Sequence, residues 1–369
     1  MDFEFTDEQL DLRDNARKVL ESACPPSTVR AVFDGQDDGT DLWSTLVDLD
    51  WPGLGVPEAH GGLGLGALEV GILVEELGRV VAPGPFLPTI TQLTPLVREA
   101  GSSFGLDDIA HGRCTGTLAL AEDGQWRLDA VRTAARRAGD GWVLDGVKTH
   151  VIHGASADEI AVVARSDQGL GAFVVPGTDI EATGRHLIDP TLPMATVSLR
   201  GVAVTGERVL VAPGNPAAET IVGRALEEST VAMALSTVAT CRTIFEVTLQ
   251  YAKDREQFGK PIGSFQALKH RLADCYLAVE RASALGYFAA LTIAEDDPRR
   301  AVAASMAKAA AGECQRLVVR DGLQLHGGIG FTWENDLHFA LKRAKAGDLL
   351  FGNAAFHRAR LAELLGLAA

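Results

Sequence analysis

The sequence YAKDREQFGKPIGSFQ occupies residues 251–266 and joins two long helical patterns. Ala, Leu, Glu, Lys and Arg dominate the chain from about residue 217 onward, a composition typical of helices. Pro261 and Pro298 mark two breaks in this region, and the pair Gly327-Gly328 marks a third. Four long helices with short connections predict a C-terminal four-helix bundle over residues 214–369.

The region before this bundle has the pattern of a β domain. Short apolar runs alternate with turn signals at residues 117–121, 134–152, 159–166, 171–176 and 195–204. No helix-length pattern separates these runs, which favours an antiparallel sheet or barrel over a doubly wound parallel sheet. The dipeptides Asp140-Gly141 and Asp145-Gly146 predict hairpin turns. We therefore expect a middle antiparallel β domain over residues 115–213.

The first part of the chain reads as helical. Residues 6–9, Thr-Asp-Glu-Gln, fit a capping box. Helical patterns cover the stretch before Pro25-Pro26, residues 41–49 and residues 67–81. The glycine-rich stretch between the last two could bind phosphate, but no strand precedes it, so a tight connection between helices is the better interpretation. The prediction is an N-terminal helical domain over residues 1–114, in a chain that is mainly α with a β domain.

Composition restricts the partners and the compartment. The chain has 34 basic and 49 acidic residues, a net charge of −15, which disfavours nucleic acid and anionic membrane as partners. No secretory signal and no run of roughly 18 uninterrupted apolar residues is visible. The five cysteines are scattered without a CxxC pair, which gives no support to a metal site and indicates reduced thiols in the cytoplasm: Cys24, Cys114, Cys241, Cys275 and Cys314.

Two segments of the bundle carry candidate binding chemistry. In the first, Arg255 can form a bidentate pair with a phosphate, Phe258 can pack on a flat ring, and Gln266 can hydrogen-bond a nucleotide. The second is QLHGGIGFTWE, residues 324–334, whose paired glycines let a ligand approach the backbone. Each segment alone also fits a solvated loop or a helix cap, but the two together inside one bundle are far more specific.

Together these segments resemble the two FAD-binding segments of the acyl-CoA dehydrogenase family. The stretches FEFTDEQLDLRD (3–14), GLGVPEAHGGLGLG (53–66) and LRGVAVTGERVL (199–210) are also similar to the family. The resemblance covers essentially the whole chain and implies the same three domains. It implies that the segments bind FAD held by a neighbouring chain, through Arg255, Gln257, Phe258, Gln266, Gln324, Gly327 and Gly328.

The sequence departs from the family at the catalytic base. The family's reaction removes an α-proton from an acyl-CoA thioester with a Glu at one of two positions. The resemblance places Ser229 and Phe351 at these positions, and neither can act as that base. Glu228 is adjacent to the first position and is a weak candidate, and Asp348 lies about one turn before the second. A solvated face is the expected role of both acids.

The middle domain departs as well. Active members carry a Glu-Pro-Gly-Ala-Gly-Ser-Asp-like loop over the flavin, where this chain has the shorter stretch of residues 121–126. Members also carry Trp-Ile-Thr or Trp-Ile-Ser beside the flavin, where this chain has His150-Val-Ile152-His153, so that Ile152 replaces the hydroxyl. The two histidines could be new acid–base groups, although a lone His on a strand is more often structural.

These departures favour a non-catalytic subunit. The resemblance extends to actinobacterial enzymes in which two related chains form a heterotetramer that acts on steroid side-chain CoA esters. The implied partners are a catalytic acyl-CoA dehydrogenase subunit, the acyl-CoA that it holds, and an electron-transfer flavoprotein. Two alternatives stay open: a self-sufficient homo-oligomeric dehydrogenase with a displaced base such as Glu228, and a non-enzymatic scaffold with the same fold.

Overall fold

A computed structural model describes residues 4–367 and divides the chain into two compact units. Unit 1 contains residues up to 39, 67–83 and 230 onward; unit 2 contains residues 40–66 and 84–229. Residues 1–3 and 368–369, at the ends of the first and last predicted domains, lie outside the described residues. The division into three domains at 114 and 213 stays a prediction.

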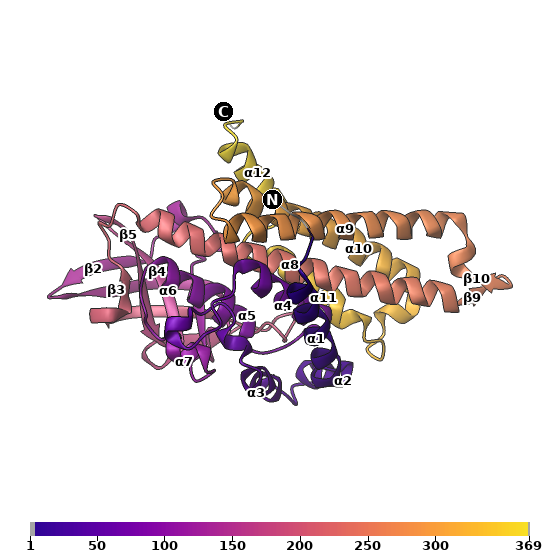
Figure 1. Cartoon of the computed structure of the whole chain (residues 1–369), viewed down its shortest axis with the longest axis horizontal. Coiled ribbons are helices and arrows are strands. Elements are labelled where there is room, and N and C mark those ends of the chain that lie inside the picture. The colour runs from indigo at the N-terminus through magenta and orange to yellow at the C-terminus, as the bar shows by residue number, and fades with distance from the viewer. Residues whose placement is uncertain (1–3, 368–369) are drawn as a thin grey trace. The chain divides into compact units, whose positions relative to one another are not determined.

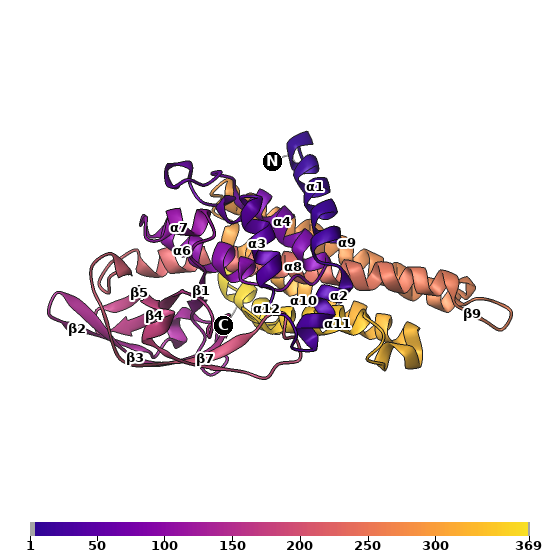
Figure 2. The same cartoon turned by 90° about the horizontal axis from the view of Figure 1, so that it is seen from below.

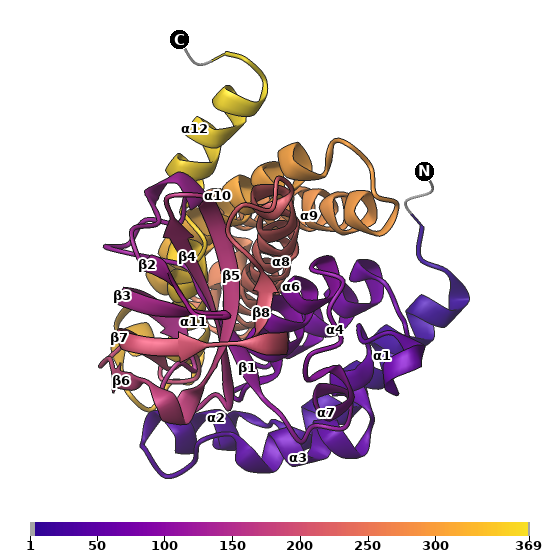
Figure 3. The ribbon, with the colours of Figure 1, turned by 90° about the vertical axis from the view of Figure 1, so that its left-hand side faces the viewer.

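Unit 2 is built on an eight-stranded mixed sheet (Figure 3). The strand order is β6-β7-β3-β2-β4-β5-β8, with β1 also paired to β4. The strands are β1 (Gly116–Ala119), β2 (Ala134–Ala138), β3 (Gly141–Ile152), β4 (Glu159–Ser166), β5 (Gly169–Pro176), β6 (Glu181–Gly184), β7 (Met194–Val204) and β8 (Val209–Val211). The helices of unit 2 are α3 (Thr40–Asp48), α5 (Phe86–Pro88), the π-helix η3 (Thr89–Leu93), α6 (Thr94–Glu99) and α7 (Leu106–Ala110).

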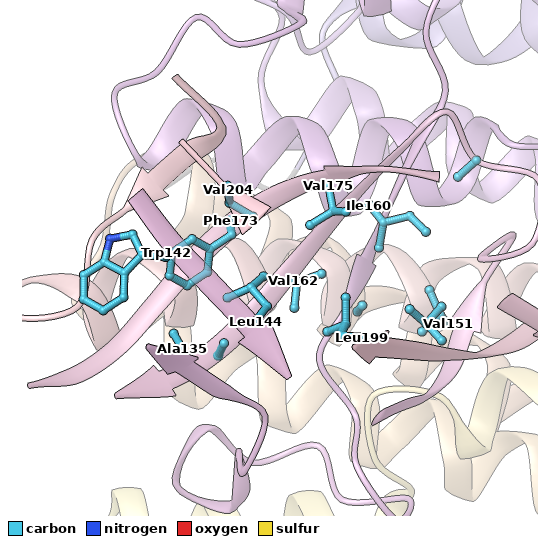
Figure 4. Close-up of a cluster of buried hydrophobic side chains, with 14 residues drawn as sticks. Ala135, Trp142, Leu144, Val151, Ile160, Val162, Phe173, Val175, Leu199 and Val204 are labelled. Atoms are coloured by element: carbon cyan, nitrogen blue, oxygen red, sulfur yellow. The ribbon is translucent and has the colours of Figure 1, made fainter. Parts of the chain in front are cut away.

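The sheet is mainly antiparallel, as predicted, but β1 and β2 each run parallel to β4. The β2–β3 hairpin lies between β1 and β4 in sequence, and after it β4 runs in the same direction as β1. β-branched and aromatic side chains fill one core, in which the rings of Trp142 and Phe173 lie 6.0 Å apart (Figure 4).

One of the two predicted hairpins is correct and the other is wrong. Ala138 pairs with Gly141 across a two-residue turn, Gly139-Asp140, in which Gly139 has a φ of 59°. Asp145-Gly146 instead lies inside β3, where the register against β7 shifts. A Cβ at Gly146 would lie 2.5 Å from Oγ1 of Thr133, so this glycine permits close approach of two chain segments rather than a turn.

Unit 1 is helical. Its helices are α1 (Asp7–Ala23), α2 (Pro26–Phe33), α4 (Ala67–Arg79), α9 (Gln266–Ala294), α10 (Arg300–His326), α11 (Leu337–Leu349) and α12 (Ala354–Leu364), together with most of α8 (Ala218–Asp254). The capping box of α1 is confirmed, because Oγ1 of Thr6 accepts from the Gln9 amide and Oε1 of Gln9 accepts from the Thr6 amide. Figures 1 and 2 show α8, α9 and α10 side by side, with the short hairpin β9 (Glu256–Gln257) and β10 (Lys260–Pro261) between the ends of α8 and α9.

Two of these helices are apolar enough to bear on the membrane prediction. Among the described residues, α8 and α9 reach the length and the mean hydropathy, 1.2, of a membrane-spanning helix. Scattered charged residues interrupt the apolar runs of both helices, so neither contains the uninterrupted run that a membrane helix was expected to show. Of the most apolar window, 72% in α8 and 44% in α9 is buried inside the protein, as in the core helices of helical bundles.

Candidate functional site

The two candidate binding segments lie at the same end of unit 1. The rings of Tyr251, in the last turn of α8, and His326, the last residue of α10, stack at 4.4 Å and 19°. His326 is buried, and its Nδ1 lies 2.9 Å from the Gly322 carbonyl oxygen. Beneath the stack is an apolar cluster from α8, α9 and α10: Ala252, Leu272 and Leu325, with Phe245, Leu249, Ile262 and Leu268 at its edge. Stack and cluster hold residues 251–266 and 324–331 as one assembly.

The hairpin between α8 and α9 presents an aromatic ring to solvent. Gln257 pairs with Lys260, which leaves Phe258 and Gly259 as a two-residue turn with φ values of 54° and 77°. Turns of this kind select Asn or Gly, and a bulky side chain at positive φ costs about 1–2 kcal/mol. Phe258 is nevertheless 91% exposed, so its side chain returns little of this cost through packing within the chain. An exposed ring kept on a strained backbone indicates an external contact.

The polar residues of the first segment are also exposed. Arg255, Gln257 and Gln266 all face solvent, and Gln266 begins α9. Residues 251–271 contain five Lys or Arg against two acidic residues, a local excess of positive charge in a chain of net charge −15. This arrangement suits a phosphate-bearing ligand, since exposed guanidinium groups bind phosphate in a bidentate manner.

The second segment ends α10 with a glycine turn. Gly327 has a φ of 62°, and its amide donates to the Gln324 carbonyl, so the turn itself requires this glycine. Gly328 has no such requirement: no described heavy atom lies within 4 Å of a Cβ built there. The missing side chain leaves open backbone beside the exposed Gln324, which a ligand can approach closely.

The chain that follows this turn is anchored by α2 and α11, an anchor that sequence reasoning missed. Nη1 of Arg30 donates to the Trp333 carbonyl at 3.0 Å, and the Arg30 guanidinium also pairs with Asp336. The Lys342 ammonium lies 4.6 Å from the Trp333 ring and 4.9 Å from the Phe33 ring. These contacts restrain the chain immediately after the glycine turn.

The first base position is a buried structural contact. Ser229 is 1% exposed, and its Oγ lies 2.8 Å from the Thr91 carbonyl oxygen and 3.0 Å from the Ala225 carbonyl oxygen. The hydroxyl therefore links α8 to the π-helix η3 within unit 2. A hydroxyl engaged in this way cannot act as the base of the family's reaction.

Glu228, the neighbouring candidate, is paired rather than solvated. Its side chain is only 10% exposed and its carboxylate forms an ion pair with Arg98. The solvated role expected for Glu228 is wrong, because α6 supplies a guanidinium from 130 residues away in sequence. Taking a proton would require loss of this charge pair, which disfavours Glu228 as a displaced base.

The second base position lies in a tight turn between α11 and α12. Phe351 is buried and has a φ of 58°, and Gly352 follows with a φ of 96°. The fully buried Lys308 ammonium donates to the carbonyls of Asp348 and Gly352, each at 2.8 Å. Burial lowers the pKa of Lys308 to about 7, although the nearby negative charge of Asp348 acts to raise it.

Asp348 also differs from its expected solvated role, because it is only 8% exposed. Its Oδ2 lies 3.3 Å from Nζ of Lys345, and its Oδ1 is buried without a hydrogen-bond partner among the described residues. A Cβ at Gly312 would lie 2.4 Å from that Oδ1, so α10 closes over the carboxylate. This enclosure leaves no room for a substrate at Asp348.

The shortened stretch of the middle region, residues 121–126, is a rigid turn. Glu122 pairs with Gln125 around Asp123-Gly124, and the Glu122 carboxylate accepts from the amide and hydroxyl of Thr133. The completely buried Lys148 donates to this carboxylate at 2.6 Å. Burial alone would raise the pKa of Glu122, but Lys148 and the hydrogen bonds lower it, whereas burial lowers the pKa of Lys148 to about 8. Glu122, Thr133 and Lys148 are therefore engaged within the chain.

The two histidines of this region occupy different environments. The exposed ring of His150 lies 6.5 Å from the buried Trp126 ring, and partial burial and the charge of Arg185 lower the pKa of His150. His153 is buried, with Nδ1 3.3 Å from the Ser156 hydroxyl. Ile152 points into the core at 1% exposure. The contact of His153 with Ser156, three residues away, is of the kind that a structural histidine makes.

Sequence comparison agrees with this arrangement along most of the chain. The model of the acyl-CoA dehydrogenase N-terminal domain matches residues 6–103, and that of the acyl-CoA dehydrogenase C-terminal domain matches residues 220–366. The chain belongs to the acyl-CoA dehydrogenase family. Its fold is the acyl-CoA dehydrogenase fold, as the sequence predicted, with an N-terminal helical domain, a central sheet and a C-terminal helical region.

Several relatives are similar over most or all of their length. The acyl-CoA dehydrogenase IpdE2 of Mycobacterium tuberculosis is 31% identical over 90% of this chain and 89% of its own. A chain of the ChsE4-ChsE5 complex from Mycobacterium tuberculosis matches with a TM-score of 0.90 and 27% identity, covering 100% of both chains. A chain of a Tcur3481-Tcur3483 steroid ACAD variant matches with a TM-score of 0.87 and 29% identity, covering 98% of both.

Proposed function

We propose that this chain is the non-catalytic subunit of a heteromeric, FAD-dependent acyl-CoA dehydrogenase, and that it lends FAD-binding residues to a catalytic partner. The observation that carries the proposal is the contrast between its two sets of residues. The seven residues carried over from the family's FAD segments are exposed or border open space at one end of unit 1. Ser229 and Phe351, at the base positions, are buried and engaged inside the chain.

The outward-facing residues fit a bound FAD. Arg255 offers an exposed guanidinium for the pyrophosphate, Phe258 offers an exposed ring, and Gln266 and Gln324 offer amides. Open backbone at Gly328 leaves space for close approach. FAD, when bound, supplies the group that accepts hydride from the acyl chain. The chain's own residues would bind the cofactor together with the catalytic subunit.

The middle region supports the same proposal. Glu122 begins a two-residue turn and accepts hydrogen bonds from Thr133 and Lys148, where active relatives carry the longer flavin loop. The buried Ile152 replaces the hydroxyl that active relatives direct to the flavin. This chain therefore has little with which to hold a flavin ring of its own.

The relatives suggest the substrate class and the assembly. Two of the solved matches are two-chain complexes, ChsE4-ChsE5 and the Tcur3481-Tcur3483 steroid ACAD. We propose the same kind of assembly for this chain: a heterotetramer in the cytoplasm that oxidises a steroid side-chain CoA ester and passes electrons to an electron-transfer flavoprotein.

Co-expression tests the proposal. The chain is purified alone and together with the acyl-CoA dehydrogenase encoded beside it, and FAD per chain is measured by absorbance in each preparation. We expect FAD and dehydrogenation only in the complex, with one FAD for each pair of chains. Replacement of Glu228 with Gln in the complex should leave the rate per FAD unchanged.

Stoichiometric FAD together with acyl-CoA dehydrogenation by the lone chain would contradict the proposal. A stable complex whose FAD content and affinity do not change when Arg255 is replaced by Gln would instead favour the scaffold alternative.

A further inference from the structure

A cavity of about 500 Å³ lies within unit 1, apart from the segments proposed to bind FAD. It is open to solvent on one side and is bordered by the junction of α1 and α2, the end of α4, part of α8 and the start of α11. Its walls are mostly apolar: Cys24, Pro25, Pro26, Val81, Val247 and Phe339. Burial raises the pKa of Cys24 to about 12, so its thiol is neutral and adds to the apolar wall. A cavity of this size with an apolar lining is typical of a small-molecule site.

Arg79 gives this cavity a charged end. It lines the apolar cavity and also a polar pocket of about 530 Å³ between α1, α4, α8 and α9. Its side chain is 19% exposed, with Nε 3.7 Å from a buried carboxylate oxygen of Glu76. Its two terminal nitrogens lie 2.9 and 3.3 Å from the carboxylate oxygens of Glu246, whose side chain is 46% exposed. The Arg79 fork is thus already arranged to hold a carboxylate, and an exposed partner such as Glu246 can be displaced at little cost.

Val81 adds a buried apolar side chain to this wall. It follows α4 with a φ of 55°, a backbone conformation in which helix ends usually carry glycine. A β-branched side chain in this conformation is strained. The side chain is buried at the cavity wall, so the sequence keeps an apolar surface where the backbone alone would favour glycine.

We propose that unit 1 binds an amphipathic monocarboxylate, with its hydrocarbon body in the apolar cavity and its carboxylate on Arg79 in place of Glu246. The two terminal nitrogens of Arg79 already hold the carboxylate of Glu246, so a ligand carboxylate matches their arrangement. The neighbouring polar pocket contains Glu246 and Glu280 together with Arg13, Arg17 and Arg242. None of the residues assigned to FAD lines either pocket, so the site is independent of the proposed function.

The test uses calorimetric titration of the full chain with decanoate below its micelle concentration, with decanol and decyl phosphate as matched probes. We expect saturable binding of decanoate that is tighter than that of either probe. Arg79→Gln should weaken decanoate binding about tenfold or more, because a charge-assisted hydrogen-bonded pair is lost. The decanoate affinity of Arg79→Lys should lie between those of the wild type and Arg79→Gln. Glu246→Gln should tighten decanoate binding a few-fold.

A steric variant separates the cavity from general stickiness. Val247 is 45% exposed at the cavity, and Val247→Trp on α8 should occlude it and abolish decanoate binding while the helix content by circular dichroism is unchanged. The matched control is Leu49→Trp, an exposed apolar position outside the cavity, which should bind decanoate normally. Absence of saturable binding, tighter binding of decyl phosphate, or equal binding by Arg79→Gln or Val247→Trp in a folded chain overturns the proposal.

Discussion

The exposed candidate FAD segments at one end of unit 1 (the outward end) differ from the buried surroundings of Ser229, Phe351 and Glu122 (the inward positions). The two regions differ in how far contacts within the chain explain their residues. At the outward end, Phe258 and Gly328 have features that the chain's own packing does not explain. At the inward positions every side chain has an internal reason: Ser229 contacts η3, Lys308 holds the Phe351 turn, and Lys148 neutralises Glu122. On the proposed function, this difference separates residues that bind a ligand from residues that stabilise the chain itself.

The largest expected effect concerns the inward region. Lys148→Met should destabilise the chain by about 3–5 kcal/mol, because it leaves the Glu122 carboxylate buried without its counter-charge. The measurement is the free energy of unfolding from urea denaturation. Arg136→Met, which removes an exposed pair with Asp145 in the same sheet, should cost at most about 1 kcal/mol. Equal losses in the two variants would show that the buried pair is no different from a surface one.

The turn at the second base position should make stability depend on pH. Lys308 has a pKa of about 7 in the folded chain, below the ordinary 10.5 of the unfolded chain. Between these values the unfolded chain binds the extra proton, so stability rises with pH by about 1.4 kcal/mol per unit and is lost as pH falls toward 7. Burial and Lys308 lower the pKa of His357 to about 3, so its ring does not titrate in this window.

The measurement is the unfolding free energy of the wild type and of Lys308→Met from pH 7 to pH 9. The unfolding free energy of the wild type minus that of Lys308→Met should rise by about 1.4 kcal/mol per pH unit. The contributions of titrating groups that both chains contain cancel in this difference. A difference that does not vary with pH would mean that Lys308 stays charged in the folded chain.

At the outward end, function and stability should separate. Arg255→Gln should weaken FAD binding by the complex about 10- to 100-fold, since a charged hydrogen-bonded pair is lost, and should leave the unfolding free energy of the lone chain unchanged. Equilibrium dialysis of FAD against the complex provides the affinity. Arg281→Gln, which alters an exposed pair with Glu313 on the same bundle, should change neither quantity.

The smallest expected effect is a gain in the stability of the lone chain. Phe258→Asn should stabilise the lone chain by about 1 kcal/mol, because Asn adopts positive φ at lower cost, while FAD retention by the complex falls. Phe331→Asn is the matched control, since Phe331 is 76% exposed but its φ is not positive, and it should give no gain. A loss of stability in Phe258→Asn would show that the ring packs within its own chain after all.

Local patterns in the sequence predicted many of the elements but not their contacts. The α1 capping box and the β2–β3 hairpin depend on residues a few positions apart, and both were predicted. Helix α2 was missed because Pro25-Pro26 was interpreted only as the end of a helix, although Pro26 begins the next one. Asp145-Gly146 looked like a turn because the close approach of Thr133 cannot be seen in sequence.

The candidate site divides in the same way. Resemblance pointed to Arg255, Phe258 and the glycine pair, which the structure brings to one end of unit 1, whereas their role toward FAD stays a prediction. The Tyr251–His326 stack that unites the two segments joins residues 75 positions apart, and no local signal announces it. Burial of Glu228 likewise depends on Arg98, which is distant in sequence, so the expectation of a solvated carboxylate could not be corrected without the fold.

The exposed rings at the outward end carry a cost outside the assembled enzyme. Phe258, Phe331 and Trp333 expose 91%, 76% and 50% of their surface. On a free chain such rings promote self-association and attract chaperones, because exposed apolar groups associate in water. If the chain is a subunit as proposed, its synthesis in excess of a partner would leave it prone to aggregation, and its solubility would depend on balanced production of the two subunits.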